Sequence, residues 1–148
     1  MSANRYITEK TIEKVRQRAN YLCEYCHASE KWQYVTFTVD HIIPVNKAGS
    51  NSIDNLALAC STPPEESLIK LVLSDRQSGK EVPLFNPRNN LWQEHFIWSR
   101  DKTLIIGLTA IGRATIITLN LNRNRIINIR AADVEVDRHP PPGDPIQA

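Results

Sequence analysis

The sequence lacks any hydrophobic run long enough to cross a membrane. Its densest apolar stretch is Leu104–Leu108, which is far short of the ~18 residues that a membrane helix requires. The first ten residues, MSANRYITEK, contain no apolar core of a secretory signal. We therefore expect a cytoplasmic protein with no membrane partner, and no feature of the sequence calls for an obligate protein partner.

An excess of charge of one sign is also lacking. The 148 residues contain 18 Lys and Arg against 16 Asp and Glu, for a net charge of +2. This mildly basic balance neither requires nor excludes a nucleic-acid partner. Hydrophobic residues make up 41% and charged residues 23%, which is typical of a soluble globular domain and excludes a disordered chain, a collagen or a long coiled coil.

Cysteine is scarce, and its three copies do not suit a disulfide framework. Two of them form the motif Cys23-Glu24-Tyr25-Cys26, and the third is Cys60. In a chain without an export signal, such a pair indicates half of a metal site or a redox pair.

Hydrophobic periodicity predicts an N-terminal helix followed by strands. Apolar residues recur at helical spacing from Thr8, a plausible cap, to about Asn20. Alternation then predicts a strand over 34–39 that ends at Asp40-His41, and a second extended segment over 55–60. A capping box beginning at Thr62 predicts a helix over 65–73.

The rest of the chain predicts further strands and one helix. We expect strands over 96–98 and 103–109, a helix over 112–130, and a disordered proline-rich tail over 139–148. The fold class is therefore α+β.

Four basic side chains are candidates for contact with a nucleic-acid backbone. They are Lys14 and Arg18 on the first helix, Arg88 in a loop, and Arg113. The alternative for each is an ordinary solvated cation.

Two stretches of sequence together resemble the HNH endonuclease family: RANYLCEYCHAS, and then FTVDHIIPVNKAGSNSIDNLALAC. The later phrases VPLFNPRNNLWQEHF and IIGLTAIGRAT extend the resemblance to stand-alone HNH proteins of the kind annotated in cyanobacteria. The resemblance covers roughly residues 10 to 130. It implies a single nuclease domain over 1–138, with a ββα-metal core (the His-Me finger) at about 21–73.

The resemblance implies a role for each matching residue. His41 is the general base, Asp40 holds a catalytic Mg²⁺ or Mn²⁺, and Asn55 orients the loop or the base, with DNA as the substrate. Cys23, Cys26 and Cys60 match three of the four ligands of a structural Zn²⁺. The chemistry agrees, because a carboxylate suits a hard cation and a neutral imidazole accepts a proton near pH 7.

The match fails directly after Cys60. Pro63 stands where the fourth zinc cysteine is expected, and Pro64 stands where the final Asn or His is expected. Proline has no donor atom in its side chain, so both ligand roles are lost at these positions. His27 or water is a possible replacement at the zinc, and Glu65 or Glu66 at the catalytic ion. Two compensating frame shifts would also produce such a local mismatch, and translation of the other reading frames tests this.

Two rival interpretations follow from these residues. In the first, the chain is an HNH-like nucleic-acid-binding protein without catalytic activity, having lost its metal site at Pro63-Pro64. In the second, Cys23 and Cys26 form a redox pair, which leaves Asp40 and His41 without a role.

Overall fold

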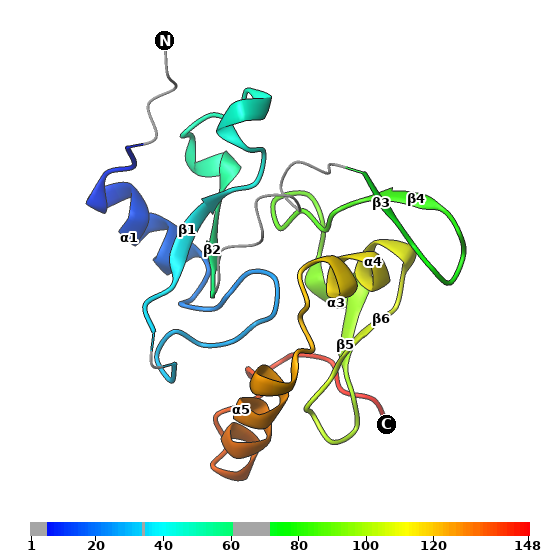
Figure 1. The fold of residues 1–148 in the computed structure, drawn as a ribbon. Helices are drawn as coiled ribbons and strands as arrows, with labels where there is room; N and C mark the ends of the chain where they lie inside the picture. The colour runs from blue at the N-terminus through cyan, green and yellow to red at the C-terminus, as the bar shows by residue number, and fades with distance from the viewer. Residues whose placement is uncertain (1–5, 34, 61–71) are drawn as a thin grey trace. The chain divides into compact units, whose positions relative to one another are not determined.

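The computed structural model describes residues 6–33, 35–60 and 72–148. The chain divides into two compact units, Met1–Ile69 and Lys70–Ala148. The described residues form helices and three two-stranded antiparallel sheets (Figure 1), which confirms the α+β class. Within these residues, no helix has the length and apolar character needed to span a membrane.

Helix α1 (Glu9–Arg18) opens the first unit where the sequence predicted it. The Thr8 hydroxyl caps the helix by accepting a hydrogen bond from the backbone N–H of Thr11 at 3.2 Å. Val15 on its inner face is completely buried, and the helix packs against strand β2.

Strands β1 (Thr38–His41) and β2 (Leu56–Ala59) form the sheet of this unit. They pair antiparallel, with Asp40 opposite Ala57 and His41 opposite Leu56. All four residues of β2 are buried, which fits the short apolar segment in the sequence. The first strand begins at Thr38 rather than near residue 34, so only its end is as predicted. Two short 3₁₀ helices, η1 (Val45–Lys47) and η2 (Ile53–Asn55), lie between the strands.

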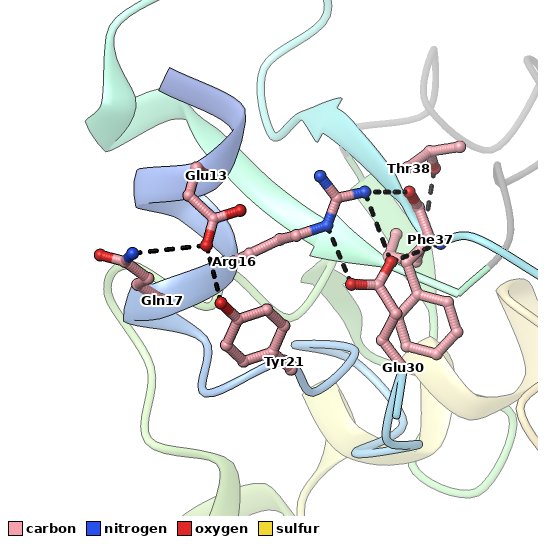
Figure 2. Close-up of polar contacts among 8 residues, drawn as sticks. Glu13, Arg16, Gln17, Tyr21, Glu30, Phe37 and Thr38 are labelled. Carbon is pink, nitrogen blue, oxygen red and sulfur yellow. Dashed lines mark hydrogen bonds and ion pairs between the residues drawn. The ribbon is translucent and has the colours of Figure 1, made fainter. Parts of the chain in front are cut away.

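Side-chain bonds replace regular pairing in the segment before β1. Arg16 on α1 binds both carboxylate oxygens of Glu30, at 2.9 and 3.4 Å, and also donates to the carbonyl of Phe37 at 3.2 Å (Figure 2). Glu30 in turn accepts from the backbone N–H of Phe37 at 2.7 Å. Tyr21 donates to Glu13 on α1 at 2.7 Å. These bonds attach the connecting segment to α1 and fix the position at which β1 starts.

The second unit begins with two hairpins. Strand β3 (Val72–Ser74) pairs with β4 (Glu81–Pro83), and β5 (Phe96–Trp98) pairs with β6 (Ile105–Gly107). Strand β5 is as predicted and β6 is shorter than predicted. The helix predicted over 65–73 is wrong at Val72 and Leu73, which belong to β3, and the rest of that prediction lies outside the described residues.

Three helices accompany these hairpins. They are α3 (Trp92–His95), α4 (Ala110–Thr118) and α5 (Asn124–Glu135). The single helix predicted over 112–130 is therefore wrong. The chain turns at Asn120, which has a positive φ of 52°, and Asn122 then pairs with both backbone groups of Ile105 at 2.9 and 2.8 Å. These hydrogen bonds between Asn122 and β6 stabilise the interruption between α4 and α5.

The core of the second unit is aromatic. Phe85, Trp92, Phe96 and Trp98 are buried, with neighbouring ring centroids 5.1 to 5.6 Å apart. Helix α4 approaches the last residue of α3 closely at Gly112. A Cβ atom at this position would lie 2.2 Å from the carbonyl oxygen of His95, so the approach requires glycine.

The C-terminal segment pairs with β5 instead of being disordered as its composition predicted. The backbone N–H of Trp98 donates to the carbonyl of Pro145 at 3.0 Å, and Gln147 donates to the carbonyl of Trp98 at 2.9 Å. The indole N–H of Trp98 also donates to Asp144 at 2.9 Å. Prolines have no N–H to donate, but their carbonyls still accept hydrogen bonds, so a proline-rich segment can extend a sheet edge.

Candidate functional site

The three cysteines, distant in sequence, come together in the first unit. Cys23 and Cys26 lie in a turn after α1, and Cys60 directly follows β2. Their three sulfur atoms all lie within 4.8 Å of one another, and the Sγ atoms of Cys26 and Cys60 are 3.5 Å apart. Cys23 and Cys26 are each only 2% exposed.

Backbone bonds hold the cysteine turn against β2. Cys23 accepts from the N–H of His27 at 2.9 Å, and the N–H of Cys26 points at the sulfur of Cys23 at 3.4 Å. Glu24 bridges the turn to the strand, because its N–H donates to the carbonyl of Leu58 and its carboxylate accepts from the N–H of Leu58. The turn and the strand end that carries Cys60 are therefore positioned by the same contacts.

This donor set fits a zinc ion. Tetrahedral Zn²⁺ with sulfur ligands at about 2.3 Å holds neighbouring sulfurs about 3.8 Å apart, close to the observed spacing. The cysteines form no disulfide bond, since 3.5 Å is far longer than a bonded S–S distance. Burial raises the pKa of the Cys23 thiol well above its usual range, and the neighbouring Cys26 and Cys60 raise it further. A bound metal cation would stabilise the three cysteines as thiolates in this buried cluster.

The fourth zinc ligand is not supplied by a described side chain. Among the residues that the structure describes, the candidate group contains the three cysteines and no additional His, Asp or Glu. His27, the replacement considered from the sequence, is therefore outside the group. Pro63, Pro64, Glu65 and Glu66 lie outside the described residues.

The two carboxylate oxygens of Asp40 differ in their hydrogen bonding. Oδ1 accepts from the Thr38 hydroxyl at 3.0 Å, whereas Oδ2 is buried and has no hydrogen-bond partner in the described part of the chain. Burial raises the pKa of Asp40, against the lowering effects of the Thr38 hydroxyl and of His41. A buried, unpartnered carboxylate oxygen is costly unless a cation or donor meets it. Asp40 is therefore suited to hold a hard divalent cation such as Mg²⁺ or Mn²⁺.

His41 is the last residue of β1 and is partly buried. The strand thus ends at the Asp40-His41 pair, as the sequence predicted. The ring Nε2 of His41 lies 2.8 Å from Oδ1 of Asn51. Sequence reasoning missed Asn51, because a polar residue in a turn-rich stretch carries no signal of its own. The fold of the loop places Asn51 next to His41, which lies ten residues earlier in the sequence.

Asn55 organises the loop that follows His41. Its Oδ1 accepts from the N–H of Ile43 at 2.8 Å, and its Nδ2 donates to the carbonyls of Ile43 and Ser50 at 3.0 and 2.8 Å. Its backbone carbonyl also accepts from the N–H of Ile42. The described contacts of Asn55 are thus those of a residue that shapes the loop.

The four basic candidates differ in their hydrogen-bond partners within the protein and in their exposure. Arg18 donates to the carbonyls of Ile53 and Leu56 at 2.7 and 2.5 Å. Arg113, in the second unit, binds both oxygens of the buried Asp75 at 3.1 and 3.0 Å. Arg88 is half-buried in its turn, whereas Lys14 is exposed on α1. Arg18 and Arg113 therefore have structural partners, and Lys14 and Arg18 are the two exposed residues of the four.

Comparison with known families identifies this segment. Residues 23–62 match the model of the family described as HNH endonuclease. Neither a curated protein nor a solved structure matches the chain. Members of this family are endonucleases that use divalent metals and act on nucleic acids. The stretch that carries the three cysteines, Asp40, His41 and Asn55 is thus the part of the chain that matches the HNH endonuclease model.

Proposed function

We propose that the first unit is a metal-dependent endonuclease that hydrolyses phosphodiester bonds of DNA. The observation that carries the proposal is the buried, unpartnered Oδ2 of Asp40, which directly precedes His41 in a segment that matches the HNH family.

His41 is the general base in this proposal. A neutral imidazole near pH 7 accepts a proton from water, which turns the water into a nucleophile for the phosphorus. The ring then passes the proton to solvent. Its only hydrogen bond among the described residues joins Nε2 to Asn51, so Nδ1 is available for this transfer.

Asp40 is the proposed ligand of the catalytic divalent cation. Such an ion, when bound, neutralises charge that develops on the phosphate and on the leaving oxygen. The Thr38 hydroxyl holds the carboxylate through Oδ1 and leaves Oδ2 to face the ion.

The remaining candidates support this centre. We propose that Cys23, Cys26 and Cys60 bind a structural zinc ion that pins the turn to the end of β2. Asn55 keeps the loop after His41 in shape. Lys14 is the proposed phosphate contact on α1, and any such contact adds affinity without reading sequence.

A plasmid-cleavage assay tests the proposed activity. The full chain is incubated with supercoiled plasmid in Mg²⁺ or Mn²⁺, with and without a chelator. We expect conversion to nicked or linear DNA that the chelator stops. The matched control is Asn46→Ala, an exposed position in η1 of the same loop, which should cleave like the unmodified protein. Cleavage that proceeds unchanged in chelator would overturn the proposal.

A second function is favoured by one feature of the sequence. Pro63 and Pro64 remove two ligand positions of the family pattern, so the chain is alternatively a DNA-binding protein without nuclease activity. DNA binding measured by fluorescence anisotropy, combined with no cleavage in either metal, would favour this alternative.

A further inference from the structure

The amide of Asn51 lies between two groups of different hydrogen-bonding character. Its Oδ1 is 2.8 Å from Nε2 of His41, and its Nδ2 donates to the backbone carbonyl of Tyr6 at 3.3 Å. The carbonyl oxygen of Tyr6 can only accept a hydrogen bond. The nitrogen of the Asn51 amide must therefore face Tyr6, and its oxygen must face His41.

This orientation determines which nitrogen of His41 carries the proton. The amide oxygen of Asn51 can only accept, so Nε2 of a neutral His41 must be the protonated nitrogen. The other nitrogen, Nδ1, then keeps its lone pair. Within the described residues, Nδ1 makes no hydrogen bond that would occupy this lone pair.

Hydrogen bonds to Ser50 and Ser52, the two neighbours of Asn51, order the loop that carries it. The carbonyl of Ser50 accepts from Asn55 at 2.8 Å, and the N–H of Ser52 donates to the Ser50 hydroxyl at 3.2 Å. The backbone N–H of Asp54 donates to the Ser52 hydroxyl at 3.4 Å. The amide of Asn51 is thus presented to His41 by an ordered loop.

We propose that Asn51 is a positioning residue that sets the tautomer and the ring orientation of His41, leaving Nδ1 as the basic nitrogen. The inference deepens the proposed function, since it identifies what prepares the general base. A histidine with the wrong tautomer cannot accept a proton at the required atom, even where its position is unchanged.

Nitrogen-15 NMR of the full chain tests the tautomer without any need for activity. Two-bond ¹H–¹⁵N correlations of the ring, assigned through the missing signals of His41→Ala, distinguish a protonated from a lone-pair nitrogen. We expect the neutral ring of His41 to carry hydrogen on Nε2 in the unmodified protein and in Asn46→Ala. We expect a mixture of tautomers in Asn51→Leu. A proton on Nδ1 in the unmodified protein would overturn the inference.

The cleavage kinetics supply a second, separate readout. Removal of the acceptor in Asn51→Leu should lower kcat about 10- to 100-fold, part of the about 10²- to 10⁴-fold that a general base contributes. Asn51→Asp keeps a hydrogen-bond acceptor beside Nε2 of His41, so it should restore most of this rate. If the unmodified chain cleaves DNA, equal cleavage rates in all three proteins would overturn the inference.

The two readouts separate this inference from the proposed function. If the unmodified chain does not cleave DNA, the proposed function fails, and the NMR experiment still decides whether Asn51 sets the tautomer. If the chain cleaves DNA and the tautomer does not respond to Asn51→Leu, only the inference fails.

Discussion

Asn55 holds Ile43 by both of its backbone groups, accepting from the N–H at 2.8 Å and donating to the carbonyl at 3.0 Å. One amide side chain thereby takes the place of a strand partner just after β1 ends. The same side chain reaches the carbonyl of Ser50. The loop after His41 is consequently anchored at its start and near its far end by a single residue.

Removal of this anchor should weaken the first unit. We expect Asn55→Ala to lower the free energy of unfolding by about 1–3 kcal/mol, because three solvent-exposed hydrogen bonds of roughly 1 kcal/mol or less each are lost. Urea denaturation followed by circular dichroism measures the change. Asn46→Ala is the control and should leave the urea midpoint in place. A midpoint for Asn55→Ala equal to that of the control would contradict the anchoring role.

Neighbouring positions in this loop should respond in opposite directions to exchange of Gly and Ala. Ala48 has a φ of 66°, so Ala48→Gly should stabilise the protein by about 0.5–1 kcal/mol. A Cβ atom on Gly49 would lie 1.7 Å from the carbonyl oxygen of Ile43, so Gly49→Ala should be destabilising. Thermal denaturation of the two variants compares them directly. Destabilisation by Ala48→Gly would show that the loop has a different backbone.

The cysteine cluster should bind one zinc ion per chain. Elemental analysis of purified protein measures the stoichiometry, and we expect Cys26→Ser to lose the metal because a hydroxyl is a poor replacement for a thiolate. Loss of zinc should also lower the melting temperature, since metal binding contributes directly to folding. Cys23→Ser should behave in the same way. Full zinc content in either variant would refute the assignment of these ligands.

Asp40 should lower the stability of the protein in the absence of its divalent cation. Burial raises the pKa of Asp40 in the folded chain, so the folded state binds this proton more tightly than the unfolded state does. Stability is therefore lost as pH rises from the ordinary carboxyl pKa of about 3.9 through the raised value. We expect Asp40→Asn to raise the melting temperature at neutral pH, in buffer without Mg²⁺ or Mn²⁺.

The pH dependence of this effect provides its control. Below the ordinary carboxyl pKa, Asp40 is protonated in both states, so the gain in stability should disappear. Thr38 can still donate to the amide oxygen of Asn at position 40, which keeps the packing comparable. A variant less stable than the unmodified protein at neutral pH would show that the carboxylate has a stabilising partner.

Local signals in the sequence predicted much of the candidate site. The Cys23–Cys26 pair and the Asp40-His41 pair are short motifs whose chemistry is visible without a fold. The family resemblance also grouped Cys60 with Cys23 and Cys26, and the three sulfur atoms lie within 4.8 Å of one another. Asn51 was missed, because its role depends on a loop that returns to the end of β1.

Periodicity was less reliable where side chains compete with regular backbone pairing. The segment before β1 alternates like a strand, yet Arg16 and Glu30 bind its backbone instead. The pairing of Asn122 with Ile105 divides what the pattern presented as one helix. Charge alone was likewise a weak guide to phosphate contacts, since Arg113 binds the buried Asp75.

The central claim is that Asp40 and His41 act together in cleaving a nucleic-acid backbone. Its most direct test is the initial rate of plasmid cleavage in Mn²⁺ by the unmodified chain, Asp40→Asn and His41→Ala, all three confirmed as folded by circular dichroism. The account predicts that each substitution lowers the rate at least about 100-fold, as expected for loss of a metal ligand or a general base. A rate in His41→Ala equal to that of the unmodified chain would contradict it.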